Sequence, residues 1–275
     1  MSRNILWLAS YPKSGNTWLR LFLFNYLFDP EKPAPINQAY RVGPSDAVAT
    51  LYRKVAKGDV DLSDARTSLK LRNQVIRAHS SNGADVNFMK THNSNMEAHG
   101  RRLIPPNLTR GAIYIIRNPF DMAVSFAHHY NSDMDDVAKA IGNPAHIVSP
   151  DPSVVHQFIG NWSDHVRSWT ENASFDCHVL RYEDMADDPE TAFGGALRFL
   201  GAPDEGEKLR KAIRFSNFDE AKKQEREFGF VERSLGSTKF FRSGRVGEGR
   251  EVLPSSAIDR IISEHGDVME KHGYL

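Results

Sequence analysis

Short apolar runs alternate along the chain with longer stretches in which apolar residues recur at helical spacing. Four of these runs predict buried strands, because each is apolar or β-branched and is followed by polar residues that start a helix. The predicted strands are Ile5–Ser10, 86–90, 112–117 and 177–182. Strands interleaved with helices in this way predict an α/β fold, with a central parallel sheet flanked by helices on both faces.

Helices are predicted where the apolar spacing is close to 3.6 residues. The first one starts at Trp18 and is apolar to Phe28 except for Arg20 and Asn25, which is typical of a helix buried on nearly all sides. The other predicted helices are 120–130, 158–169, 183–200, 205–215 and 255–272. Segments 30–84 and 131–152 are polar and interrupted by Pro and Gly, so they predict irregular structure with short helices.

Composition narrows the class of protein. The 275 residues fit one domain spanning 1–275, with a hydrophobic fraction of 40% and a formal net charge of zero. This balance gives no reason to expect a nucleic acid or a membrane as partner. Cys177 is the single cysteine, so an intrachain disulfide is excluded and a cytoplasmic location is expected. The sequence leaves the oligomeric state open.

The most informative segment follows the first strand, and it reads Tyr-Pro-Lys-Ser-Gly-Asn-Thr-Trp over positions 11–18. A strand, a tight turn that contains glycine and a helix start form an anion site, because backbone N–H groups and the helix dipole favour negative charge. The spacing differs from that of an ATP-binding P-loop, in which lysine directly follows the second glycine. Lys13 instead lies two residues before Gly15. The segment therefore predicts a phosphate cradle.

This segment closely resembles the 5′-phosphosulfate loop of sulfotransferases that use 3′-phosphoadenosine 5′-phosphosulfate (PAPS) as donor. The resemblance implies a P-loop-like fold and a single sulfotransferase domain. It also implies a set of donor-binding residues in this loop: Lys13, Ser14, Gly15, Asn16, Thr17 and Trp18, with Trp18 packing on the adenine.

A second motif follows the third predicted strand, where ligands of open α/β sheets bind. Arg117-Asn118-Pro119-Phe120-Asp121 is followed by Ser125 two helical turns into the next helix. An arginine fork and a serine hydroxyl both suit a phosphate. The full pattern resembles the sulfotransferase site for the 3′-phosphate, with Arg117 and Ser125 at the matching positions.

Further donor contacts are implied by the resemblance alone. Tyr182 matches a tyrosine that reaches the base edge, and Phe218 is similar to a phenylalanine on the other face of the purine. In the glycine-rich segment 224–254, the run Arg242-Ser243-Gly244 resembles the loop that folds over the 3′-phosphate. Ser243 stands where a lysine is common, and the role of Arg245 stays open. We expect this long loop to be mobile alone and ordered by the donor, the alternative being a loop permanently packed by its aromatic pair.

Catalysis requires a base for the acceptor hydroxyl and positive charge around the sulfuryl group. Lys90-Thr91-His92 resembles the Lys-x-His of this family and follows a predicted strand. Histidine accepts a proton near neutral pH, which makes His92 the candidate base, with His128 and His129 as the other candidates. Lys13 and Lys90 are the candidate charge stabilisers, and no metal is expected.

The resemblance implies a PAPS-dependent sulfotransferase that transfers a sulfuryl group directly, in line, to an acceptor hydroxyl or amine and releases adenosine 3′,5′-bisphosphate (PAP). Segments 31–84 and 131–157 are expected to form the pocket of a small-molecule or natural-product acceptor. A P-loop-type kinase using ATP and magnesium is the alternative enzyme, and a non-catalytic nucleotide-binding protein is the alternative of another class. The acceptor itself is not predicted.

Overall fold

The computed structural model describes residues 3–203, 205–234 and 236–275. Leu235, in the predicted loop 224–254, lies outside the described residues, as do positions 1, 2 and 204 of the predicted domain. Backbone contacts divide the chain into two compact units, which are described separately. The first consists of Met1–Tyr11, Gly43–Tyr114 and Asn143–Val179. The second consists of Pro12–Val42, Ile115–Gly142 and Leu180–Leu275.

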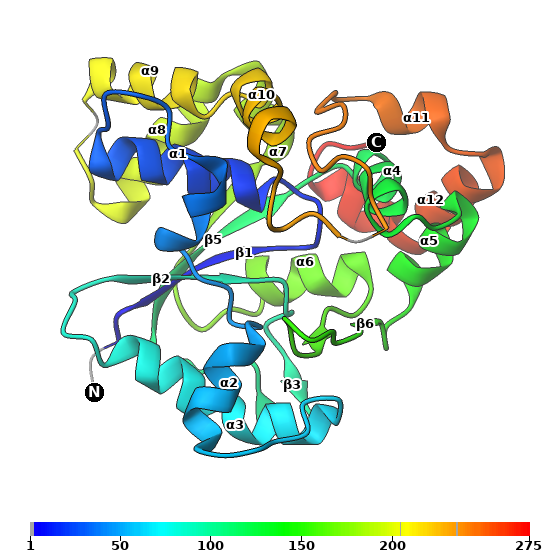
Figure 1. The fold of residues 1–275 in the computed structure, drawn as a ribbon. Helices are drawn as coiled ribbons and strands as arrows, with labels where there is room; N and C mark the ends of the chain where they lie inside the picture. Colours follow the sequence, from blue (N-terminus) through cyan, green and yellow to red (C-terminus); the bar gives the residue numbers. More distant parts are fainter. Residues whose placement is uncertain (1–2, 204, 235) are drawn as a thin grey trace. The chain divides into compact units, whose positions relative to one another are not determined.

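A four-stranded parallel sheet has the strand order β2-β1-β5-β8, which confirms the predicted α/β class (Figure 1). Its strands are β1 (Ile5–Ser10), β2 (Asn87–Thr91), β5 (Thr109–Ile116) and β8 (Cys177–Arg181). All six residues of β1 are buried, as expected for a central strand covered on both faces. β1 pairs with β2 in a register that sets Ala9 opposite Thr91, so the carboxyl ends of these two strands lie side by side.

The first unit adds helices and two short hairpins to the sheet. These elements are α2 (Ala49–Ala56), α3 (Ala65–Ser80), β3 (Glu97–Ala98), β4 (Arg101–Arg102), β6 (Ile147–Val148), β7 (Gln157–Phe158) and α6 (Trp162–Thr170). In Figure 1, α2 and α3 lie against each other. The aliphatic side chains of Val75 and Val155 pack with Tyr52 in the buried cluster between them.

The second unit is mainly helical. Its elements are α1 (Asn16–Phe28), η1 (Ile36–Arg41), α4 (Pro119–Tyr130), α5 (Met134–Gly142), α7 (Tyr182–Asp187), α8 (Pro189–Leu200), α9 (Gly206–Phe215), α10 (Phe218–Phe228), α11 (Glu248–Val252) and α12 (Ser255–Lys271). In Figure 1, α9 lies beside α1 and α8, whereas α4, α5, α11 and α12 gather in a second group.

Helix boundaries differ from the predictions where a capping residue interrupts the apolar spacing. The predicted helix 158–169 is wrong at its start, because Phe158 belongs to β7 and Gly160 has a φ of 63°. Asn161 then caps α6 by accepting a hydrogen bond from the N–H of Asp164. The predicted helix 183–200 is two helices, since Asp188 caps a new helix that begins at Pro189.

The segments predicted to be irregular contain more helix than expected. α3 has 16 residues within 30–84, and Asp64 caps it by accepting from the N–H groups of Arg66 and Thr67. The segment 224–254 is not one continuous loop, because α10 runs to Phe228 and α11 lies within it.

Candidate functional site

The turn between β1 and α1 is built to expose backbone N–H groups. Lys13 and Gly15 both adopt left-handed backbone conformations, with φ values of 66° and 105°. Gly15 is required there twice over, because a Cβ at this position would also lie 2.8 Å from the Tyr182 ring. Among the described residues, no side chain caps the start of α1. The first N–H groups of the helix are thus available to an anion.

The hydroxyl and amide side chains of this turn divide into two kinds. The Ser14 hydroxyl is buried and has no hydrogen-bond partner among the described residues. By contrast, Arg20 Nε donates to Asn16 Oδ1 at 3.1 Å, and Arg20 Nη2 donates to Thr17 Oγ1 at 3.1 Å. Arg20 fixes these two side chains, whereas Ser14 retains an unsatisfied polar atom that suits a phosphate oxygen.

Arg20 is itself a site residue that sequence reasoning missed. It is 1% exposed and forms a bidentate ion pair with Glu232, at 2.8 and 2.7 Å. The sequence does mark Arg20, because it is the one charged residue in the otherwise mostly apolar helix α1. No local pattern marks Glu232, which lies 212 positions away. Through its hydrogen bonds to Asn16 and Thr17, the paired Arg20 fixes the start of α1.

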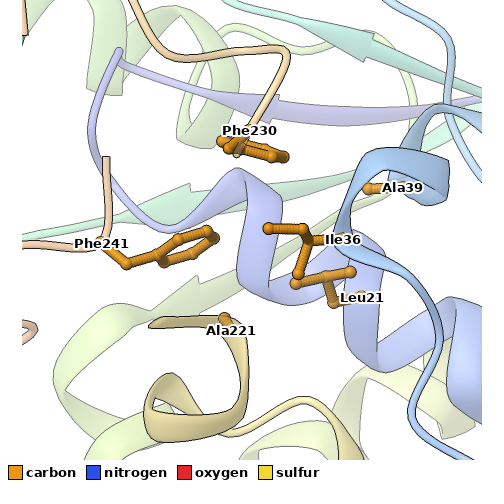
Figure 2. Close-up of a cluster of buried hydrophobic side chains, with 6 residues drawn as sticks. All are labelled: Leu21, Ile36, Ala39, Ala221, Phe230 and Phe241. Atoms are coloured by element: carbon orange, nitrogen blue, oxygen red, sulfur yellow. The ribbon is translucent and has the colours of Figure 1, made fainter. Parts of the chain in front are cut away.

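Lys13 points at an aromatic ring of the glycine-rich segment. Its ammonium nitrogen lies 3.7 Å from the centroid of Phe240, a cation–π geometry. The neighbouring Phe241 is 7% exposed and packs with Phe230, Ile36 and Leu21 in the cluster drawn in Figure 2. The aromatic pair therefore anchors the middle of the predicted covering loop; its response to a donor stays a prediction.

Arg117 lies at the carboxyl end of β5, where the sequence predicted an anion contact. It is 7% exposed, and its guanidinium donates to the carbonyl oxygens of Lys13 at 3.1 Å and Arg245 at 3.4 Å. The guanidinium also stacks on the Tyr182 ring, 4.0 Å from the centroid. Its Nε is buried without a hydrogen-bond partner among the described residues. A buried cation held by carbonyl oxygens is ready for an anion.

Two carboxylates that the sequence analysis did not assign hold the surroundings of Arg117. Asp121 is 3% exposed and accepts from the N–H groups of Gly247 at 2.8 Å and Gly249 at 2.6 Å. Glu183 accepts from the N–H of Asn118 at 2.9 Å, and burial raises the pKa of Glu183. Both carboxylates thus accept hydrogen bonds from backbone N–H groups. The half-buried Ser125 lies further along α4.

Two of the three aromatic residues predicted for the purine, Tyr182 and Phe218, lie against Gly244, and the third, Trp18, contacts Tyr182. Tyr182 OH donates to the Gly244 carbonyl at 3.1 Å, and Trp18 meets the Tyr182 ring edge-to-face at 5.6 Å. Gly244 has a φ of 68°, and a Cβ there would lie 2.7 Å from the Phe218 ring. The Trp18 Nε1 is buried without a partner among the described residues. The structure therefore joins Trp18 directly to Tyr182 and links Phe218 to Tyr182 through Gly244, and it adds Phe193, whose ring lies 5.8 Å from that of Trp18.

The arginines of the glycine-rich segment are occupied by carboxylates. Arg242 forms a bidentate pair with Glu248 at 2.8 and 2.6 Å, and Arg245 pairs with Glu251 at 2.9 Å. The hydrogen bond from Arg242 lowers the pKa of Glu248, which stays ionised. Ser243 does not supply the positive charge of the lysine that is common at this position. Its hydroxyl accepts from the Arg245 N–H at 3.4 Å. Arg242 must exchange Glu248 for a phosphate if it is to bind one.

His92 follows β2 in the first unit. Its Nδ1 lies 2.9 Å from the Ser10 carbonyl oxygen. Because a carbonyl can only accept, Nδ1 carries the proton and Nε2 carries the lone pair of the neutral ring. The His92 carbonyl in turn accepts from His165 Nε2 at 3.1 Å, and Tyr114 OH lies 2.9 Å from His165 Nδ1. Burial lowers the pKa of His165 to about 4, so this supporting ring is neutral.

A buried carboxylate holds the residues on both sides of His92. Asp46 Oδ2 accepts from Thr91 Oγ1 at 2.6 Å and from Asn93 Nδ2 at 3.2 Å, and it pairs with Arg72 at 2.5 Å. Asp46 is fully buried, as is Thr91. Lys90, one residue earlier, is fixed through its backbone, which bonds Pro44 and Asp46 at 3.0 Å each. We refer to Asp46, Arg72, Thr91 and Asn93 as the Asp46 cluster.

The two alternative histidines lie in α4 of the second unit. Burial lowers the pKa of His128. His129 meets the ring of Phe240 edge-to-face at 5.6 Å. Within the described residues, no group of three or more His, Cys, Asp or Glu side chains is arranged to hold a metal ion. The same residues contain no helix that is long and apolar enough to cross a membrane.

Comparison with known proteins places these features in a family. The family model described as "Sulfotransferase domain" matches residues 3–271. Cytosolic sulfotransferase 15 of Arabidopsis thaliana is 28% identical, over 92% of this chain and 68% of that protein. Sulfotransferase 1E1 of Cavia porcellus is 26% identical, over 78% of this chain and 64% of that protein.

Solved structures share the fold. Mouse sulfotransferase SULT7A1 in complex with PAP superposes with a TM-score of 0.61 at 20% identity, covering 98% of this chain and 86% of that one. Retinol dehydratase in complex with retinol and PAP superposes with a TM-score of 0.64 at 19% identity, covering 97% of this chain and 81% of that one.

Proposed function

The chain belongs to the sulfotransferase domain family, and we propose how its own residues carry out sulfuryl transfer from PAPS. Family membership makes the protein an enzyme of this class and gives no support to the kinase alternative. The observation that carries the residue assignment is Arg117, a buried guanidinium without a carboxylate partner among the described residues.

The residues of the second unit fit a nucleotide with phosphates at both the 3′ and 5′ positions. The Ser14 hydroxyl and the Arg117 Nε are buried polar atoms that lack partners among the described residues, and a phosphate oxygen would satisfy each. We assign the 5′-phosphosulfate to the loop from Lys13 to Thr17, and the 3′-phosphate to Arg117, Ser125 and the loop of Arg242. Trp18, Tyr182 and Phe218 would hold the adenine by packing and through the Trp18 Nε1.

The acceptor is activated by His92 in this proposal. Its Nε2 takes the hydroxyl proton while the acceptor oxygen bonds to sulfur and the bond from sulfur to the PAP phosphate oxygen breaks. Lys13 and Lys90 are assigned to the charge that develops on the sulfuryl oxygens. The Asp46 cluster would act indirectly, since Thr91 and Asn93 fix the chain on both sides of His92.

The acceptor is proposed to be a small molecule with a hydroxyl group. Retinol dehydratase, which shares the fold, has been solved with androsterone and with retinol, two small molecules that carry hydroxyl groups. Segments 31–84 and 131–157 remain the candidates for the acceptor pocket. A cytoplasmic location is proposed from the cytosolic relatives.

The assignment of the base is tested with His92→Gln. We expect turnover to fall by about 10²–10⁴-fold while the dissociation constant for PAP stays within about twofold of wild type, because a general base acts on the transition state. His128→Gln is the matched control, since it removes the alternative histidine of α4. Retained turnover in His92→Gln, with loss in His128→Gln, would move the base to α4.

A further inference from the structure

We propose that the hollow between α3 and the β3–β4 hairpin of the first unit binds an organic dianion of the phosphate-monoester kind. The hollow has a volume of about 380 Å³ and is lined by Arg66, Leu69, Lys70, His99 and Arg101. Three of these side chains are permanent cations and none is acidic. None of them belongs to the donor or catalytic residues assigned above, so this proposal stands apart from the proposed function.

Two of the cations come from α3 and repel each other. Arg66 and Lys70 are four residues apart, so they lie one above the other on the same helix face. Like charges at this spacing destabilise a helix. The nearby carboxylate of Asp64 accepts from the N–H groups of Arg66 and Thr67 as the cap of α3, and it interacts with the Arg66 charge only at longer range. Neither cation has an ion-pair partner among the described residues. An anion in the hollow would relieve this repulsion.

The third cation comes from the hairpin, where the register separates it from the local acid. Glu97 pairs with Arg102 across the hairpin, and Ala98 pairs with Arg101. Glu97 and Arg102 form an ion pair at 3.3 Å. Because side chains alternate between the two faces of a strand, Arg101 lies on the same face as the buried Ala98 and opposite Glu97. The single acid of this hairpin therefore leaves Arg101 uncompensated.

The turn of the hairpin adds a histidine in a strained conformation. His99 has a φ of 48° and Gly100 a φ of 71°, the pattern of a two-residue turn in which asparagine and glycine are preferred. A histidine at the first position costs backbone strain, and such strain persists where the side chain has a use. The His99 ring rests edge-to-face on Phe158 at 6.2 Å, which directs it along the wall of the hollow.

The composition of the wall indicates the ligand. Three permanent cations favour a group with two negative charges over a monoanion, and the volume exceeds that of an inorganic oxyanion. Leu69 is 4% exposed and offers an apolar contact. A phosphoryl dianion attached to a small organic body meets these conditions, and a sulfate monoester, with one charge, should bind more weakly.

The test is titration calorimetry at pH 8 on the full chain saturated with PAP, so that the donor site does not take up the probe. Phenylphosphonate and benzenesulfonate are the probes, because their C–P and C–S bonds resist transfer. We expect one equivalent of phenylphosphonate to bind, at least fivefold more tightly than benzenesulfonate. The double variant Lys70→Gln/Arg101→Gln should weaken phenylphosphonate binding at least tenfold.

The control is Lys54→Gln/Arg110→Gln, which removes the same charge from exposed positions of the same unit and should leave the affinity unchanged. Lys70→Gln alone should melt at a higher temperature than wild type when no anion is added, because it removes the repulsion from Arg66. Absence of stoichiometric binding, or equal weakening in the control, would overturn the proposal. A tighter fit for benzenesulfonate would overturn the dianion assignment.

Discussion

Two buried arginines, one in each unit, are held in opposite ways. Arg72 is 4% exposed and pairs with the carboxylate of Asp46, and its Nε donates to the Leu103 carbonyl at 2.8 Å. Arg117 is 7% exposed, but its partners are the carbonyls of Lys13 and Arg245 and the face of Tyr182. The Arg72 guanidinium is paired directly with a carboxylate, whereas Arg117 has no direct ion pair among the described residues and has only a longer-range interaction with Glu183.

This difference is the basis for proposing that Arg72 has a structural role and that Arg117 binds a ligand. Taking a guanidinium out of water is costly, and a carboxylate partner with further hydrogen bonds offsets that cost. Carbonyl oxygens orient a guanidinium without neutralising it. Arg72 is therefore neutralised within the folded chain, while the proposed 3′-phosphate would supply Arg117 with a direct anionic partner.

The largest expected effect comes from removing the internally paired arginine. Arg72→Met leaves Asp46 buried and uncompensated, so the free energy of unfolding should fall by about 3–5 kcal/mol. Urea denaturation measures this loss. The double variant Asp46→Asn/Arg72→Met should recover a large part of it, because no charge is then buried alone. If Arg72→Met unfolds like wild type, the contrast between the two arginines is wrong.

The free energy of unfolding should depend on pH because His165, which donates to the His92 carbonyl, stays neutral in the folded protein. The pKa of His165 falls from 6.5 to about 4 on burial, so the unfolded chain takes up a proton before the folded one does. Stability is therefore full above pH 6.5, decreases as the pH falls toward 4, and loses on the order of 3 kcal/mol in total. His165→Gln should flatten this slope between pH 6.5 and 4, measured by urea denaturation; an unchanged slope would contradict the buried neutral ring.

The smallest of the three effects concerns Arg117, which has no direct ion pair among the described residues, and it should appear in ligand binding. Arg117→Gln should weaken PAP by about 1.5–3 kcal/mol, or about 10- to 150-fold, because it removes charged hydrogen bonds to the 3′-phosphate. Affinity for 5′-AMP should change little, and thermal unfolding without ligand serves as the control. Equal losses for both nucleotides would separate Arg117 from the 3′-phosphate. This test measures nucleotide binding only, so its outcome does not depend on whether the hollow between α3 and the β3–β4 hairpin binds an anion.

Prediction of the fold from the sequence worked best where burial is complete. β1 was predicted to the residue, since every position of Ile5–Ser10 is apolar or small and buried. β5 starts earlier than predicted, at Thr109, whose hydroxyl accepts from Trp7 Nε1 at 2.9 Å. Only tertiary contact identifies that start. α3 was missed as a long helix because its charged face hides the spacing of its buried residues.

Sequence motifs select candidate site residues that lie close together in the chain, but they do not reveal the distant side chains that hold those residues in place. Motifs identified the Lys13 loop and Arg117, which the structure joins through a hydrogen bond. Asp46 lies 45 positions from Thr91, and Glu232 lies 212 positions from Arg20. A carboxylate that acts at such a separation leaves no pattern in one sequence, because its partners are chosen by the fold.

The ion pair of Arg242 with Glu248 bears on how fast a product can leave. In the proposed donor complex, Arg242 turns from this carboxylate to the 3′-phosphate, so nucleotide binding is an exchange of one anion for another. When PAP departs, Glu248 can recapture the guanidinium as the phosphate loosens, which shortens the time that an unpaired cation spends near the empty nucleotide site. If Arg242 binds the 3′-phosphate as proposed, Glu248 competes with that phosphate for the guanidinium, which would lower donor affinity and speed the release of PAP.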